Sequence, residues 1–270
     1  MNIAYIKNIT PFSDINEILY SFVSTLHTIL NDNLIGVYLL GSLTYGNFKI
    51  ESSDIDLQVL LKNKLTVNEI ELIQQLHSQI AKDFPQWAKR IECSYVPLDT
   101  LTNILPPLSP RPYYGEDILY PEAPYGNEWI INQYMLYQHG IALIGPEYKT
   151  LISPIDFVEV QKACIRDLLQ EWQPKISDQE WLANSHYQSY LVLNLCRILY
   201  TVIGNELASK KVSAAWVKNH FAPQWRGLIE IAEQWQYGLE MRMQNEAIQF
   251  INFVIDEITK LPLYHEAIKQ

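Results

Sequence analysis

The chain has 270 residues, of which 48% are hydrophobic and 19% charged, so it can form one large domain or two smaller ones around a real core. Its formal net charge of -10 argues against nonspecific binding to nucleic acid and is compatible with a cationic substrate. No apolar run is long enough to span a membrane, no signal-peptide pattern is present, and three cysteines without a paired motif indicate a reduced, cytoplasmic protein.

The first half of the chain alternates between helical and strand patterns, which is typical of an α/β or α+β domain. Apolar residues recur at helical spacing near the N-terminus, from Ile15 to Leu30, and two later apolar runs read as buried strands. A third strand ends at Pro97, because proline cannot continue a strand ladder. The sequence therefore predicts helices over 14–30 and 67–83, and strands over 35–40, 56–61 and 90–96.

A proline- and tyrosine-rich segment follows over residues 103–127. It is compatible with a long surface loop, or with a hairpin or lid that contacts a ligand, since long loops in compact domains are often functional. A helix is expected to begin near Asn127 and to end at Gly140, where glycine supplies a C-terminal cap.

The second half of the chain reads as entirely helical. Asp156 followed by Glu159 resembles a capping box at the start of a helix. Further helices are predicted over about 184–203, from Ser209 onward, and over about 241–260. We place a domain boundary near residues 153 and 154, which predicts an N-terminal domain over 1–153 and a helical domain over 154–270.

The strongest chemical signal joins Gly41-Ser42 to Ser53-Asp54-Ile55-Asp56. Gly41 allows the backbone to approach a triphosphate, and Ser42 can offer a hydroxyl and a backbone N–H to phosphate oxygens. Asp54 and Asp56 are two residues apart, so both carboxylates would lie on one face of a strand. Two such charges are stabilised by a cation, and magnesium uses hard oxygen ligands together with substrate phosphates.

A third carboxylate is required on a neighbouring strand, and Glu92 is the candidate. Taken alone, Glu92 is equally compatible with an edge strand or an outward-facing acid. Combined with Asp54 and Asp56, it predicts two magnesium ions that assist attack by a hydroxyl and departure of pyrophosphate.

A second group of polar residues lies in the helical half. Asn194, Arg197 and Thr201 interrupt a nearly apolar helix and share one of its faces, with Tyr190 one turn earlier. An arginine there requires an anion, which could be an internal salt bridge or a phosphate. Lys210 falls in the first turn of its helix, where the dipole disfavours a cation, so it is either a simple exposed lysine or a second phosphate contact.

These residues resemble one family. Gly41-Ser42 with Ser53-Asp54-Ile55-Asp56 is similar to the signature of the DNA polymerase β-like nucleotidyltransferases. Within that superfamily the chain resembles the streptomycin/spectinomycin (AadA-type) adenylyltransferases over nearly its whole length. The supporting matches are Arg90-Ile91-Glu92, His139-Gly140 to Gly145-Pro146, the segment from Asn194 to Tyr200, and the segment from Ser209 to Trp216.

The resemblance implies an α+β fold, with a mixed β-sheet and flanking helices followed by a C-terminal α-helical bundle that closes the cleft for ATP and acceptor. It implies transfer of AMP from ATP to a hydroxyl of an aminoglycoside or aminocyclitol antibiotic, with magnesium. By match, Asp54, Asp56 and Glu92 hold metal, and Glu92 is also the base. Nucleotide contacts are implied for the following residues: Gly41, Ser42, Ser53, Arg197, Lys210 and Tyr237.

The chain departs from the family pattern in one place. The drug-contacting acids and tryptophan of the family precede the arginine helix, but residues 177–186 carry Asp178, Glu180 and Trp181 in a different register. The acceptor therefore stays open: it is a small cationic molecule with a hydroxyl, or else a protein, a nucleotide or another metabolite. A non-catalytic nucleotide-binding regulatory module is the remaining alternative. The sequence does not show the oligomeric state, and a monomer is compatible with it.

Overall fold

The computed structural model describes residues 3–221 and 223–269. Internal contacts divide the chain into two units. The sheet unit comprises Met1–Phe48, Ser53–Tyr125 and Asn132–Pro154, and the helical unit comprises Lys49–Ser52, Gly126–Ile131 and Ile155–Gln270. Helix α3 (Glu128–His139) contributes residues to both units, so the chain crosses between them more than once.

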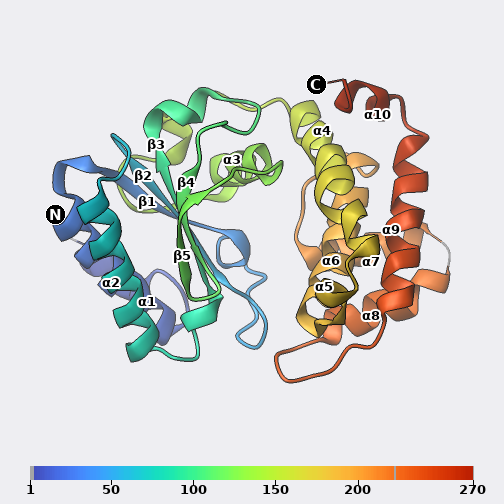
Figure 1. Cartoon of the computed structure of the whole chain (residues 1–270), viewed down its shortest axis with the longest axis horizontal. Coiled ribbons are helices and arrows are strands. Elements are labelled where there is room, and N and C mark those ends of the chain that lie inside the picture. Colours follow the sequence, from blue (N-terminus) through green and yellow to red (C-terminus); the bar gives the residue numbers. More distant parts are fainter. Residues whose placement is uncertain (1–2, 222, 270) are drawn as a thin grey trace. The chain divides into compact units, whose positions relative to one another are not determined.

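The sheet unit is built on a six-stranded mixed sheet with the order β5-β4-β3-β2-β1-β6 (Figure 1). Strands β2 and β3 run parallel, whereas the other neighbouring pairs are antiparallel. The two central strands are therefore connected by a crossover, which α2 supplies. The strands are β1 (Leu34–Leu40), β2 (Ile55–Leu61), β3 (Ile91–Pro97), β4 (Arg111–Gly115), β5 (Ile118–Ala123) and β6 (Ile141–Ile144).

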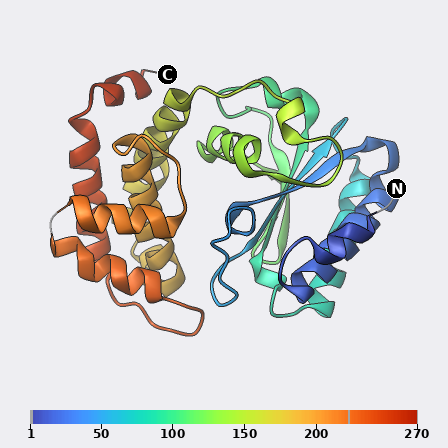
Figure 2. The same ribbon diagram turned by 180° about the vertical axis from the view of Figure 1, so that it is seen from behind.

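Helices α1 (Ser13–Leu30) and α2 (Val67–Asp83) lie together on one face of this sheet (Figures 1 and 2). Thr66 and Glu69 form a capping box that fixes the start of α2. The apolar stripes of both helices pack against alternate residues of β1, β2 and β3, such as Val37, Val59 and Tyr95, to form the core of the unit.

The opposite face of the sheet carries polar side chains at its centre. Gln58 of β2 is buried and donates to Tyr148 Oη at 2.9 Å, and Tyr148 in turn donates to Gln133 of α3. Gln133 also donates to Gln58 Oε1 at 3.4 Å, so the three side chains satisfy one another. This closed network holds α3 on the face that also carries Asp56, because residues two apart on a strand point the same way.

The segment 103–127, expected to be a long loop or a ligand-contacting hairpin or lid, adds a hairpin to the sheet. Strands β4 and β5 pair through a two-residue turn in which Glu116 and Asp117 have φ of 52° and 65°. Two consecutive positive φ angles match the twist of a tight hairpin. Tyr114 donates to Asp117 Oδ1 at 2.7 Å and fixes the turn.

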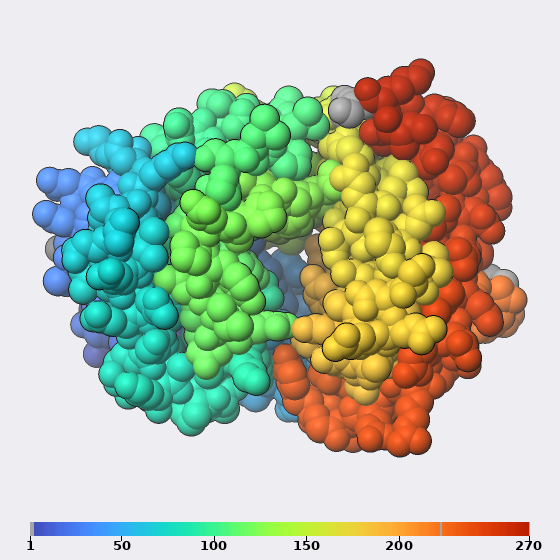
Figure 3. Space-filling view, in the orientation of Figure 1, coloured from blue at the N-terminus to red at the C-terminus, as the bar shows by residue number. Residues whose placement is uncertain are grey.

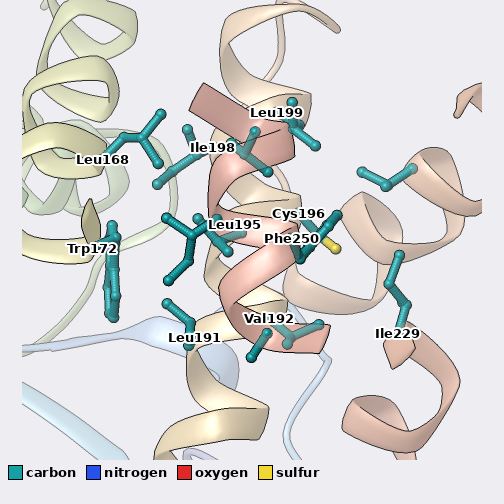
Figure 4. Packing of buried hydrophobic residues seen from close by; sticks show 14 of the residues in the cluster. Leu168, Trp172, Leu191, Val192, Leu195, Cys196, Ile198, Leu199, Ile229 and Phe250 are labelled. Atoms are coloured by element: carbon teal, nitrogen blue, oxygen red, sulfur yellow. The ribbon is translucent and has the colours of Figure 1, made fainter. Parts of the chain in front are cut away.

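The helical unit surrounds α6, whose apolar side chains form its core with α4, α8 and α9 (Figure 4). In the space-filling view, α4 and the C-terminal helices form the visible face of this unit (Figure 3). Among the described residues, no helix combines the length and the apolar character that crossing a bilayer requires. The helices are α4 (Phe157–Asp167), α5 (Gln179–Ala183), α6 (Ser185–Val202), α7 (Lys210–His220), α8 (Arg226–Gln234), α9 (Gln244–Thr259) and α10 (Pro262–Ala267).

Two local details differ from the sequence-based expectations. Asp156 does cap α4, but its side chain accepts from Val158 N, and the Glu159 carboxylate contacts Lys162 Nζ at 3.1 Å instead of completing a capping box. The helix that begins at Phe157 also changes character after Asp167, where Leu168–Trp172 form a π-helical turn. Such single turns occur frequently at functional sites.

Candidate active site

The first part of the site is the turn that follows β1. Gly41 has φ of +69°, which favours glycine, and it begins a 3-10 turn over Gly41–Leu43. A Cβ on Gly41 would lie 1.9 Å from Asp56 Oδ2, so the glycine is also required by the carboxylate beside it. Ser42 lies within this short turn rather than at the start of an α-helix, so it would offer an anion its hydroxyl and N–H without the dipole of an α-helix.

Asp56 and Glu92 stand opposite each other on the two parallel strands at the centre of the sheet. Directly paired residues project to the same face, so both carboxylates lie on the face that α1 and α2 do not cover. The edge-strand alternative for Glu92 is wrong, because β3 lies between β2 and β4. Glu92 is exposed and Asp56 half-buried, so both carboxylates can be reached from solvent.

Asp54 is placed differently from the expectation that it shares a strand with Asp56. Strand β2 begins at Ile55, so Asp54 belongs to the segment before it. Arg90 reaches this segment: its Nε donates to the Ser53 carbonyl oxygen at 3.1 Å and lies 3.9 Å from Asp54 Oδ1. The position of Asp54 therefore depends on side-chain contacts in addition to the strand ladder.

The donor set of Asp54, Asp56 and Glu92 fits magnesium, which prefers carboxylate oxygens. Within residues 3–221 and 223–269, no three His, Cys, Asp or Glu side chains are already gathered as a metal site. Magnesium does not require such a cluster, because it is commonly held by one or two carboxylates, water and substrate phosphates. Because Gly41 has no side chain to fill the space beside Asp56, this carboxylate can lie against the turn that follows β1.

In the helical unit, the face of α6 that carries Arg197 is polar and buried. Arg197 Nε, Asn194 Nδ2 and Thr201 Oγ1 are all buried without a hydrogen-bond partner in the described part of the chain. No direct ion pair joins Arg197 to an acid among these residues, although its charge acts on Asp167 of α4. Arg197 as a whole is half-buried, but a buried donor such as its Nε is costly without an acceptor, which favours an anionic ligand at this face.

Asp167 adds a titratable group near Arg197. Burial raises the pKa of the Asp167 carboxyl to about 7, and the Arg197 charge opposes part of that rise. The π-helical turn brings Trp172 Nε1 to Asp167 Oδ2, to which it donates at 2.6 Å. Asp167 could not be found from the sequence, because the i to i+5 geometry of a π turn does not appear in apolar spacing.

Lys210 and Tyr237 are connected through aromatic side chains at the beginning of α6. Lys210 is the first residue of α7, and its Nζ lies 4.4 Å from the centroid of the Tyr190 ring. The His186 ring lies 6.2 Å from Tyr190 and 5.3 Å from Tyr237. Since Tyr190 shares the α6 face of Arg197, the helical unit places one face of polar and aromatic groups beside Lys210.

The stretch 177–186 that departs from the family pattern has structural roles in this unit. Asp178 caps α5 by accepting from Trp181 N at 3.0 Å. The Trp181 ring stacks on Tyr187 at 4.8 Å, and Lys175 Nζ lies 5.0 Å from its centroid. Glu180 is exposed in the first turn of α5.

The candidate residues thus form two groups. Gly41, Ser42, Ser53, Asp54, Asp56 and Glu92 belong to the sheet unit, and Arg197, Lys210 and Tyr237 belong to the helical unit. Sequence reasoning missed the roles of Arg90, Asp167 and His186 in supporting them. Only Arg90 carried a usable signal, because an arginine two residues before Glu92 enters an otherwise largely apolar strand.

The chain is similar to known proteins over most of its length. Residues 150–259 match the family described as "Aminoglycoside adenylyltransferase, C-terminal domain". The aminoglycoside (3'') (9) adenylyltransferase of Shigella flexneri is 26% identical over 261 residues, which is 92% of this chain and 97% of that protein. The spectinomycin 9-adenylyltransferase of Campylobacter jejuni is 26% identical over 94% of this chain and 98% of its own length.

The fold is also shared with a solved structure. This is the crystal structure of spectinomycin adenyltransferase AAD(9) from Enterococcus faecialis with ATP and spectinomycin, which superimposes with a TM-score of 0.72 at 20% identity. The match covers 90% of this chain and 98% of that one, which confirms the expected α+β fold with a helical C-terminal part. The resemblance indicated by the motifs is confirmed: the chain is similar over most of its length to aminoglycoside and spectinomycin adenylyltransferases, and its residues 150–259 match the model of their C-terminal domain.

Proposed function

We propose that this chain is an ATP- and magnesium-dependent adenylyltransferase that transfers AMP to a hydroxyl of an aminoglycoside or aminocyclitol antibiotic of the streptomycin or spectinomycin type. The observation that carries the proposal is the pairing of Asp56 with Glu92 beside Gly41. It occurs in a chain related to named adenylyltransferases over 92% and 94% of its length.

In this reaction the acceptor oxygen attacks the α-phosphorus of ATP, and the bond from that phosphorus to the bridging oxygen of pyrophosphate breaks. Glu92 takes the proton of the acceptor hydroxyl, for which an exposed carboxylate on the face of the sheet opposite α1 and α2 is suited. Gly41 and Ser42 admit the triphosphate to the turn after β1, and Ser53 lies at the approach to the same carboxylates.

Asp54 and Asp56, with Glu92 as a third carboxylate, would hold two magnesium ions. Bound magnesium would neutralise the triphosphate and the departing pyrophosphate. The carboxylates of Asp56 and Glu92 lie away from the apolar core, since both residues project from the face of the sheet opposite α1 and α2.

The phosphate contacts of the helical unit are part of the same proposal. The buried Arg197 Nε without a hydrogen-bond partner among the described residues supports a phosphate ligand for this side chain. Lys210 at the first position of α7 and Tyr237 beside His186 would add a second cation and an aromatic surface for the nucleotide. In this proposal the domain over 1–153 and the helical domain over 154–270 each supply residues that bind ATP, and the enzyme acts in the cytoplasm.

The acceptor is proposed on charge and on relatedness. The net charge of -10 suits a cationic, hydroxyl-bearing antibiotic and disfavours nucleic acid. Because Asp178 and Trp181 are engaged in a cap and a ring stack, they are not assigned as drug contacts.

An acceptor screen tests the proposed function. The protein would be incubated with ATP, magnesium and one acceptor at a time, with pyrophosphate release as the readout. Spectinomycin, streptomycin, other aminoglycosides, nucleotides and a protein substrate form the panel. Release that depends on spectinomycin or streptomycin supports the proposal, and release with another acceptor reassigns the substrate. Tight ATP binding without release for any acceptor would favour a regulatory nucleotide-binding module.

A further inference from the structure

We propose that Arg90 is the positioning residue for Ser53 and Asp54, the segment that presents the first metal-binding carboxylate. The inference rests on the proposed function, because it assigns Asp54 to the metal. Arg90 does not reach the reacting atoms in this account. It acts through Asp54, which it holds at the approach to β2.

The contacts of the guanidinium define this role. Nε donates to the Ser53 carbonyl oxygen at 3.1 Å, and Nη2 donates to the same oxygen. Nε also lies 3.9 Å from Asp54 Oδ1. A single arginine therefore contacts both the backbone before Asp54 and the Asp54 carboxylate, which a lysine with one donor centre could not reproduce.

The register of the central strands explains why Arg90 is at this position. Ile55 pairs with Ile91, and Asp56 pairs with Glu92, so one step back Arg90 stands level with Asp54. The ladder between β2 and β3 begins at Ile55 and Ile91, and the Arg90 side chain adds hydrogen bonds between the segments that precede these two strands. The three carboxylates are thereby held to one pair of strands: Asp56 and Glu92 by the ladder, and Asp54 by Arg90.

The guanidinium is itself held in place. Arg90 is only 9% exposed, and its Cζ lies 4.2 Å from the centroid of the buried Trp87 ring. Trp87 packs on Phe48 at 6.0 Å, and Phe48 on Phe12 at 5.1 Å. This row of rings fixes the plane of the Arg90 guanidinium, so its hydrogen bonds to the Ser53 carbonyl oxygen are made in one orientation.

The course of the chain shows why Asp54 needs such an anchor. Residues Lys49–Ser52 belong to the helical unit, where Lys49 Nζ donates to the Glu233 carbonyl oxygen at 3.2 Å. Ser53 is the residue at which the chain re-enters the sheet unit. Arg90 binds that residue, and so it fixes Asp54 independently of the preceding segment.

Two opposite effects of removing Arg90 can be separated by metal binding. Loss of a nearby positive charge would by itself favour a divalent cation at Asp54. Loss of orientation would weaken cation binding, because a misplaced ligand no longer contributes. We infer that orientation dominates, since the contact with the carboxylate is long at 3.9 Å whereas the backbone oxygen receives two donors.

The test measures Mn²⁺ binding by the electron paramagnetic resonance signal of the free ion, with a non-hydrolysable ATP analogue present. The full-length chain is compared with Arg90→Met and Arg90→Lys. Ile73→Ala serves as the control. Ile73 is a fully buried core residue of α2, so its truncation lowers the stability of the sheet unit without removing a contact of Ser53 or Asp54. If Arg90→Met does not fold by circular dichroism, Arg90→Lys, which keeps the charge, carries the test.

We expect Mn²⁺ affinity to fall about tenfold in both Arg90 variants, which corresponds to about 1.4 kcal/mol. The affinity should stay unchanged in Ile73→Ala. Unchanged or tighter Mn²⁺ binding in both Arg90 variants would overturn the inference. Pyrophosphate release is measured in parallel. A wild-type protein that binds Mn²⁺ but releases no pyrophosphate would contradict the proposed function and leave the Arg90 result readable. A wild-type protein that binds no Mn²⁺ would overturn both.

Discussion

The Asp56 carboxylate lies so close to Gly41 that a Cβ at residue 41 would fall 1.9 Å from Asp56 Oδ2. The turn at which we propose that the triphosphate binds and the carboxylate that would hold its metal therefore lie against each other. Any side chain at residue 41 displaces Asp56 and also forces a positive φ of 69° on a residue that disfavours it.

Replacing Gly41 by alanine should therefore abolish most of the activity. Gly46→Ala is a matched control, because Gly46 has φ of +73° but nothing within 4 Å of its would-be Cβ. Both variants carry the backbone strain, which costs on the order of 1 kcal/mol, and only Gly41→Ala displaces Asp56. We expect adenylyl transfer to fall at least about a hundredfold in Gly41→Ala and less than about tenfold in Gly46→Ala, in steady-state assays at equal folded concentration.

Glu92→Gln should separate nucleotide binding from turnover. The amide preserves shape but cannot accept the acceptor proton, so we expect kcat to fall about 10²- to 10⁴-fold with little change in ATP affinity. Glu71→Gln, an exposed acid on α2, controls for the loss of one negative charge. Full turnover by Glu92→Gln would remove Glu92 as the base.

Arg197→Met should weaken ATP binding without destabilising the free protein. The Arg197 Nε is buried without a hydrogen-bond partner among the described residues, so removing the charge relieves a desolvation cost. Loss of a charged contact to phosphate is worth about 1.5–3 kcal/mol, or roughly ten- to hundredfold in affinity.

Titration calorimetry and thermal unfolding measure the two effects of Arg197→Met. Arg242→Met is the control, since the Arg242 side chain is 81% exposed in the same unit. A lower melting temperature with unchanged ATP affinity would indicate that Arg197 is a structural residue.

The sheet unit should be sensitive to acid through His77. Burial lowers the pKa of His77 to about 3, and its Nε2 lies 2.7 Å from Tyr95 Oη. The folded pKa lies below the unfolded value of 6.5, so the contribution of the neutral ring to stability is complete above pH 6.5 and is lost as the pH falls towards 3. Between pH 7.5 and 4.5 this amounts to about 2–3 kcal/mol.

His77→Gln should therefore lose less stability than the wild type over that pH interval, although it starts lower at pH 7.5 because the contact with Tyr95 is changed. Urea unfolding at both pH values measures the difference, and the exposed His265→Gln is the control. Equal pH dependence in wild type and His77→Gln would contradict the buried neutral state of His77.

Much of the sheet unit could be predicted because its elements are long and strongly patterned. The strand expected over 35–40 is β1, and the helix expected over 67–83 has the bounds of α2. The hairpin of β4 and β5 was not resolved by the sequence, because β5 is an exposed edge strand without alternating burial and prolines surround it. The four-residue β6 was missed because so short a strand has no readable period.

The residue types of the candidate site could be predicted from the sequence, but their arrangement in space could not. The spacing of Asp54 and Asp56 indicated a metal, yet strand β2 begins between them, and the segment that holds Asp54 is contacted by Arg90 from the 3-10 turn before β3. Likewise, the sequence showed that Arg197 needs an anion but could not tell a salt bridge from a ligand. That distinction depends on which side chains of α4 and α6 meet, and only the tertiary structure contains this information.

The most direct test of the central claim follows the α-phosphate of ATP. The protein would be incubated with magnesium, spectinomycin or streptomycin, and ATP labelled at the α-phosphorus in one reaction and at the γ-phosphorus in another. The account predicts that the α label appears on the antibiotic, that the γ label leaves as pyrophosphate, and that Glu92→Gln suppresses both. Transfer of the γ label to the antibiotic, or no transfer of either label to these antibiotics, would contradict it.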